Sequence, residues 1–318
     1  MSVIFTRCCR LSSIMTILSL GFLRAQGQPS QIEAVQSDAD VEKLVRGVDD
    51  YYANFTVNSA LHFADKRVER KCRQAHVKAW EKADFDGNGR VDLLVTGIHF
   101  NGRSKALCLL DMGNGKLVLE TFRRLPNRTC PIATVSYQGA QPIINYADFD
   151  RLSLYAARLK GKQSFRLVYE YGGFIEYNAL PANPARPDSI LYKSIFAYHE
   201  VQQVRLTLTN TGSAIYYACT YPVLEEANKT YVSQKTLVDT LTLATIQGLA
   251  SYLAAQHLLP EYHSGLNHVP YTTLTISYHN GRHLQVEDEG EAGTFGLTRL
   301  YALLSQLHKS QTWQPAKP

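Results

Sequence analysis

Three segments of the chain have hydrophobic residues at the spacing of an amphipathic helix. The first is DADVEKLVRGV, for which Asp38 or Asp40 is the expected N-cap. The other two are TLTLATIQGLASYLAAQHLL, beginning at residue 240, and GLTRLYALLSQLHKS, beginning at residue 296. We therefore expect one helix near the N-terminus and two helices in the C-terminal half.

Between these segments, apolar and polar residues alternate in short runs that end at turn-forming residues. Such runs are typical of half-buried β-strands, and Gly or Asn between two of them favours a tight hairpin. The clearest example is YTTLTISYHNGRHLQVED, in which Asn280 and Gly281 separate two alternating runs. The predicted hairpin turns are at residues 113–115, 160–162, 172–173, 210–212 and 280–281.

A proline-rich segment, LPANPARPDS, follows the first group of strands. Proline removes backbone donors and stiffens the chain, which is typical of a linker. The sequence therefore predicts an α+β protein with two domains. Residues 31–180 form an N-terminal helix and an antiparallel β-meander domain, and residues 181–189 form the linker. Residues 190–313 form a smaller α+β domain of two hairpins and two helices.

The N-terminal segment differs from the rest in charge and hydrophobicity. Arg7 and Arg10 precede the apolar run LSSIMTILSLGFL, and small residues follow it. This pattern predicts a signal peptide at residues 1–25, cleaved after Ala25 or Gly27. No later segment resembles a transmembrane helix, so we expect an exported protein of the periplasm or the extracellular space.

Net charge gives no support for nucleic-acid binding. Removing Arg7, Arg10 and Arg24 with the signal peptide lowers the formal charge of +5 by three, to +2. The remaining basic run, ADKRVERKCR, is short and typical of a solvated surface.

The mature chain keeps four cysteines: Cys72, Cys108, Cys130 and Cys219. An even number permits disulfides in an oxidising compartment, and the pair expected here is Cys72 with Cys130. Cys108 lies in an apolar run and is equally explained as a buried thiol.

The segment KADFDGNGRVDLLVTG has oxygen-bearing side chains at alternating positions. Calcium binds six to eight oxygen ligands, and a tightly curled loop brings alternating side chains to one point. The expected ligands are the side chains of Asp84, Asp86, Asn88 and Asp92 and the carbonyl oxygen of Arg90. A turn that binds no metal is the alternative, since Asp, Asn and Gly favour turns by themselves. Because Asp111 lies outside this loop in the sequence, we expect its substitution to leave metal binding intact.

This loop resembles the calcium loops of FG-GAP repeats, the repeats of integrin-type propellers. The shared pattern is D-x-D-x-N-G-x-x-D, with Gly89 at its sixth position, followed by the strand DLLVTG. The twelfth position is Val95, which argues against an EF-hand, because an EF-hand has glutamate there. The chain has one copy of the pattern, so the resemblance implies a calcium motif within another fold.

The C-terminal half contains VRLTLTNTGSAIYY, GLASYLAAQHLLPEY, YTTLTISYHNGRHLQV and FGLTRLYALLSQL. This succession of hairpin, helix, hairpin and Leu-rich helix is similar to a domain of unknown function in exported bacterial proteins. Members of that family often have a Cys-Gly-Cys-Pro motif before the first hairpin, where this chain has SIFAYHEVQQV. The resemblance implies a fold and no activity.

Sequence motifs for catalysis are absent. The chain has no G-x-S-x-G elbow, no S-x-x-K pair and no phosphate-binding glycine loop. Histidines concentrate between residues 257 and 283 without metal-ligand spacing, and the nineteen tyrosines suit a sheet surface or contacts with protein or carbohydrate. We therefore expect an exported, non-catalytic binding or envelope-associated protein with an unknown protein or glycan partner. The alternative is a hydrolase whose carboxylates or histidines come together only in three dimensions.

Overall fold

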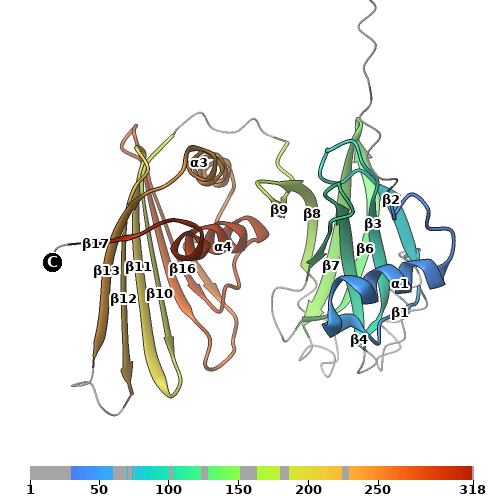
Figure 1. Cartoon of the computed structure of the whole chain (residues 1–318), viewed down its shortest axis with the longest axis horizontal. Helices are drawn as coiled ribbons and strands as arrows, with labels where there is room; N and C mark the ends of the chain where they lie inside the picture. Colours follow the sequence, from blue (N-terminus) through green and yellow to red (C-terminus); the bar gives the residue numbers. More distant parts are fainter. Residues whose placement is uncertain are drawn as a thin grey trace, which may run out of the picture.

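The computed structural model describes the main chain of residues 30–59, 70, 74, 76–99, 103–122, 128–150, 163–179, 186–223 and 229–316 (Figure 1). The signal peptide, the turn at 160–162 and Cys72, all predicted from the sequence, lie outside these residues, as does the side chain of Cys130. The helices are α1 (Asp38–Val48), the 3-10 helix η1 (Asp50–Tyr52), α3 (Thr240–Ala254) and α4 (Phe295–Ser310). In the described part of the chain, no helix is long and apolar enough to cross a membrane.

The strands form three sheets. The first, a five-stranded sheet, has the order β1-β3-β4-β5, with β2 also paired with β3. Its strands are β1 (Thr56–Val57), β2 (Trp80–Ala83), β3 (Asp92–His99), β4 (Arg103–Asp111) and β5 (Leu117–Thr121). The second, a four-stranded sheet, consists of β6 (Arg128–Gln138), β7 (Gln141–Asp150), β8 (Gln163–Glu170) and β9 (Gly173–Glu176), in sequence order. Both sheets are antiparallel meanders, as the alternating pattern predicts.

The third sheet has eight strands in the order β14-β16-β15-β10-β11-β12-β13-β17. Its strands are β10 (Pro187–Ala197), β11 (Glu200–Thr209), β12 (Ser213–Pro222), β13 (Thr230–Leu237), β14 (Glu261–His263), β15 (Tyr271–Tyr278), β16 (His283–Glu289) and β17 (Gln314–Pro315). The pairing of β14 with β16 is parallel, and its other pairings are antiparallel. The hairpins β11–β12 and β15–β16 are the two that the sequence predicts in this half.

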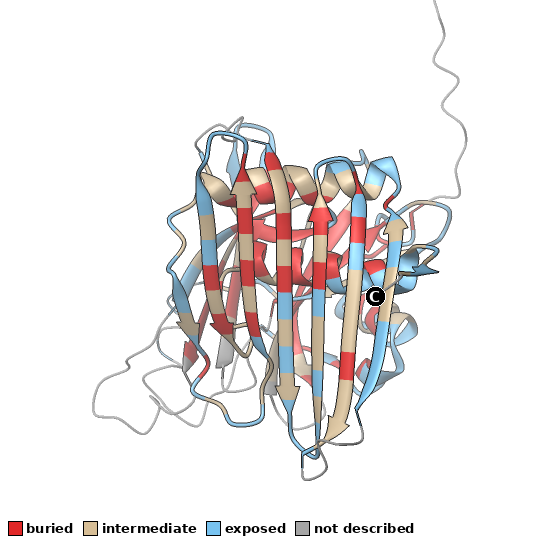
Figure 2. Cartoon of the chain, turned by 90° about the vertical axis from the view of Figure 1, so that its left-hand side faces the viewer, coloured by how far each residue is buried: buried red, intermediate tan, exposed pale blue. Residues whose placement is uncertain are grey.

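The elements stack in layers, which Figure 1 shows from right to left. α1 packs on one face of the five-stranded sheet, whose other face packs on the four-stranded sheet. The opposite face of the four-stranded sheet packs on α3 and α4, which cover one face of the eight-stranded sheet. The other face of that sheet is open and is turned to the viewer in Figure 2. The α+β fold class predicted from the sequence is confirmed.

The two predicted domains share a hydrophobic core. Ile143, Val168 and Ile175 from the four-stranded sheet belong to the same buried cluster as the apolar faces of α3 and α4. The proposed linker also ends earlier than the sequence indicates. β10 begins at Pro187, so residues 187–189 are strand, which proline tolerates at the first position of a strand.

Two local predictions need correction. The N-cap of α1 is Ser37, whose hydroxyl accepts the N–H of Asp40 while the Asp40 carboxylate accepts the N–H of Ser37. This reciprocal pair forms a capping box. The hairpin β8–β9 turns at Tyr171 and Gly172, with φ of 52° and 73°, one residue before the predicted Gly-Gly pair. Tertiary contacts hold this tyrosine in the left-handed region, since the Arg299 side chain donates to its carbonyl oxygen at 2.9 Å.

Candidate metal centre and open sheet face

The predicted metal loop connects β2 and β3. Ala83, at the end of β2, pairs with Asp92, at the start of β3, so the loop closes a hairpin. One carboxylate oxygen each from Asp84, Asp86 and Asp92 lies within 4.8 Å of the other two. Three carboxylates at this distance repel one another unless a cation or a proton lies between them. An all-oxygen group of this kind fits a hard cation such as calcium.

Two glycines and local hydrogen bonds shape the loop. Gly87 and Gly89 have φ of 72° and 81°, a region that favours glycine. The N–H of Asn88 donates to Oδ1 of both Asp84 and Asp86, each at 3.1 Å. The N–H of Gly89 donates to Oδ2 of Asp84 at 2.9 Å. The loop backbone therefore fixes the positions of these two carboxylates before any cation binds.

The Asn88 side chain, another predicted ligand, has different surroundings. The Asn88 amide Nδ2 donates to Oδ2 of Asp86 and to the carbonyl oxygen of Asp111, both at 2.9 Å. Its Oδ1 accepts the N–H of Arg90 at 2.8 Å. In this rotamer the Asn88 side chain gives Asp86 a donor, and a 180° rotation of the amide would present its oxygen instead.

Asp92 is the buried member of the group. Its side chain is fully buried and accepts the N–H groups of Phe85 and Asp111, both at 2.8 Å. Burial raises the pKa of Asp92 to about 6, and the neighbouring charge of Asp86 adds to this effect against the backbone hydrogen bonds. Burial, and then the charge of Asp84, raises the pKa of Asp86 in the same direction. Both shifts show that negative charge is unfavourable here without a cation.

Asp111, at the end of β4, supports the loop, and the sequence reasoning missed this role. Its carboxylate binds Arg90 through two hydrogen bonds, Nε to Oδ1 at 2.9 Å and a terminal nitrogen to Oδ2 at 3.1 Å. Burial alone would raise the pKa of Asp111, but hydrogen bonds from Arg90 and Ser30 hold it below its usual value. Asp111 also bonds Asn88 and Asp92 through its backbone. The expectation that its substitution leaves metal binding intact stays a prediction. The only signal in the sequence was its place beside the turn Gly113-Asn114-Gly115.

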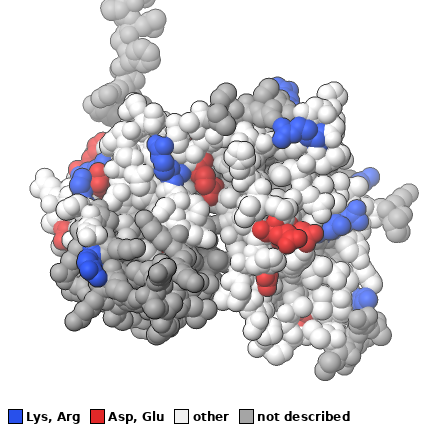
Figure 3. Space-filling model, turned by 180° about the vertical axis from the view of Figure 1, so that it is seen from behind, with Lys and Arg blue, Asp and Glu red and all other residues white. Residues whose placement is uncertain are grey.

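The remaining candidate groups do not form a second centre. Among the described residues, Asp84, Asp86 and Asp92 are the one group of three or more metal-type side chains this close together. Asp and Glu also gather on the C-terminal half, to the right in Figure 3, with Lys and Arg beside them. In that half of the chain, His263 lies 3.6 Å from Glu261 and 3.3 Å from Glu289, and all three are partly exposed. Cys108 is a free, buried thiol, as the apolar run suggests, and Cys219 is also free and buried.

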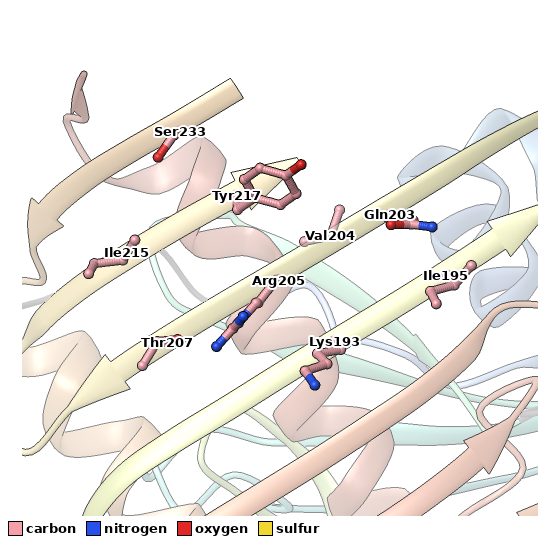
Figure 4. Close-up of a pocket in the computed structure, with 9 residues that line it drawn as sticks. All are labelled: Lys193, Ile195, Gln203, Val204, Arg205, Thr207, Ile215, Tyr217 and Ser233. Carbon is pink, nitrogen blue, oxygen red and sulfur yellow. The ribbon is translucent and has the colours of Figure 1, made fainter. Parts of the chain in front are cut away.

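The open face of the eight-stranded sheet has a shallow groove of about 520 Å³. Figure 4 shows its side chains standing on β10, β11, β12 and β13. The lining residues are Lys193, Ile195, Gln203, Val204, Arg205, Thr207, Ile215, Tyr217 and Ser233. These described lining residues include two cations, Lys193 and Arg205, and no carboxylate or histidine.

Comparison with known proteins gives no relative. No protein-family model, curated protein or solved structure matches the chain.

Proposed function

We propose that this chain is an exported, non-catalytic binding protein in which a calcium ion stabilises the β2–β3 hairpin. The observation that carries the proposal is the convergence of Asp84, Asp86 and Asp92 on one point. Their positions in a loop between two strands suit a structural role, because the ion would join the start of β3 to the loop that precedes it. The FG-GAP resemblance of the same residues supports the choice of calcium.

A non-catalytic role is supported by the surroundings of these carboxylates. Asp92 is committed to three backbone N–H groups, those of Phe85, Asp86 and Asp111. A general acid or base must come within hydrogen-bond reach of a substrate, and the Asp92 carboxylate is fully buried. The partner is a protein or a glycan, and exposed aromatic side chains that suit such contacts are Tyr51, Tyr137 and Tyr198.

Thermal unfolding with calcium and with a chelator tests the proposal. For a Kd of about 1 mM, typical of extracellular calcium modules, 10 mM calcium stabilises the fold by about 1.4 kcal/mol. This raises the melting midpoint by about 2 to 3 °C for a chain of this size. Asp84→Asn and Asp86→Asn should each remove most of the increase. Asp50→Asn is the matched control, since Asp50 is exposed and distant in sequence from the loop. Equal midpoints in calcium and chelator for the unaltered protein would refute the metal centre.

A further inference from the structure

The open face of the eight-stranded sheet has its positive charge on one side. From Ser189 onward, the outward-facing positions of β10, β11 and β13 carry Lys193, Arg205 and Lys235, and those of β10 to β13 carry no carboxylate. Lys193 and Arg205 are directly opposite each other on neighbouring strands. Neither side chain has a hydrogen-bond or ion-pair partner among the described residues. Like charges in directly opposite positions destabilise an antiparallel pair, so this arrangement favours a bound anion.

The negative charge of the same face lies on the other side. The acidic residues of the outward-facing positions are Glu261 on β14 and Glu287 and Glu289 on β16. They lie across β15 from Lys193, and no ion pair joins them to it within the described chain. The face is therefore divided into a basic part and an acidic part.

Strand register places the two parts in one row. Glu287 is opposite Thr273 on β15, which is opposite Lys193 on β10. Glu261 lies beyond Glu287 in this row, and Arg205 lies beyond Lys193. The row thus reads acid, acid, neutral, base, base from one strand to the next. If the order of the strands is reversed about β15, each acidic position of the row takes the place of a basic position.

We propose that the open face is the interface of a symmetric dimer, with a second copy of this chain as its occupant. A two-fold axis that lies between two copies and parallel to their strands reverses the strand order and keeps each row in place. With the axis over β15, Glu287 of each copy faces Lys193 of the other, and Glu261 faces Arg205. This gives four oppositely charged contacts in a self-complementary interface.

The size of the face agrees with what a stable dimer needs. The axis over β15 brings five strands of each copy into the overlap, namely β14, β16, β15, β10 and β11, and four of these have 7 to 11 residues. At about 4.8 Å between strands and about 3.4 Å per residue, they cover roughly 24 Å by 27 Å, or about 650 Å². A standard interface buries about 600 to 1,000 Å² per partner.

The face also offers apolar contacts near the charged row. Ile195, Ile215 and Tyr271 are 42%, 51% and 41% exposed, although they lie on the central strands of the sheet. Ile195 and Ile215 line the groove of Figure 4 on either side of Arg205. In the dimer, β14 and β16 of the second copy lie over the β10–β11 part of this groove, and their carboxylates meet its two cations. Two sheets packed face to face at about 10 Å interdigitate such side chains.

Charge reversal tests the dimer. Light scattering and sedimentation of the exported chain should give twice the mass of one chain at micromolar concentration. The variant Lys193→Glu/Arg205→Glu and the variant Glu261→Lys/Glu287→Lys should each dimerise at least about 100-fold more weakly, because like charges then face each other. An equal mixture of the two variants should recover the dimer, since every contact again joins opposite charges.

Lys235→Glu is the control for a general effect of charge on association. It changes the same kind of charge on β13, outside the overlap, and should leave the dimer unchanged. A monomeric unaltered chain at 100 µM overturns the proposal, and the basic groove is then free for an anionic ligand. A dimer that survives either double reversal, or a mixture that stays monomeric, overturns it as well. Far-UV circular dichroism of each variant confirms that it is folded, so a monomer is not mistaken for an unfolded chain.

Discussion

The titration of Asp92 should make the proposed calcium binding depend on pH in a range where the affinity of calcium sites with exposed aspartates does not change. The pKa of Asp92 is raised to about 6 by burial, whereas an unfolded chain titrates near 3.9. Without calcium, the folded state therefore holds this proton more tightly than the unfolded state. This contribution to stability is fully present below about pH 4 and is lost as the pH rises through about 6. The difference between these two pKa values corresponds to roughly 3 kcal/mol in the free energy of unfolding.

Stabilisation by calcium should instead increase as the pH rises, because calcium binds the deprotonated carboxylate. At pH 7.5 Asp92 is almost fully ionised, and a Kd of about 1 mM gives about 1.4 kcal/mol at 10 mM calcium. At pH 5 roughly one molecule in eleven has Asp92 ionised, which weakens the apparent affinity about tenfold. The stabilisation by 10 mM calcium then falls to about 0.4 kcal/mol.

Urea unfolding at pH 5, 6 and 7.5, each with 10 mM calcium and with chelator, measures this decrease. Asp92→Asn removes the more buried titrating group, so its small remaining calcium effect should change less between pH 5 and 7.5 than that of the unaltered protein. Asp50→Asn, far from the loop in sequence, should show the same decrease as the unaltered protein. A calcium effect of equal size at pH 5 and 7.5 in the unaltered protein would show that Asp92 is not a ligand.

Two further predictions concern the packing between layers, and urea unfolding measures both. Glu176, at the end of β9, accepts the first N–H groups of α4, those of Phe295 and Gly296, at 2.6 and 3.0 Å. Glu176→Ala should lower the free energy of unfolding by about 2 kcal/mol, because it removes a charged cap from a helix N-terminus. The control, exposed Glu200→Ala, should change it by less than about 0.5 kcal/mol. A Cβ at Gly97 would lie inside the van der Waals radii of the Phe55 ring and the Thr56 carbonyl oxygen. Gly97→Ala should therefore cost about 2 to 3 kcal/mol, while Gly47→Ala, in an open position of α1, should stabilise by about 0.5 to 1 kcal/mol. The packing argument fails if the two glycine substitutions have the same effect.

Elements whose signals are local were predictable from the sequence. The helix α1 was found from its apolar spacing, and the turns at Asn210–Gly212 and Asn280–Gly281 from residues that favour them. The turn at Tyr171 was missed by one residue, because tyrosine has no intrinsic preference for a positive φ. Contacts with Arg299, 128 residues away in the chain, decide that conformation. Tertiary contacts of this kind override a local preference, and the neighbouring sequence contains no signal of them.

The same division between local and distant signals holds for the candidate metal centre. Asp84, Asp86 and Asp92 are within nine residues of one another, so their convergence follows from the curl of one loop. Asp111 is 21 residues from Arg90, and it reaches the loop only because β4 pairs with β3. Burial of Asp92 depends on that same pairing, since the N–H of Asp111 binds its Oδ1. The raised pKa of Asp92 is therefore a property of the sheet, not of the motif, and a free peptide with this loop sequence should bind calcium without the change between pH 5 and 7.5.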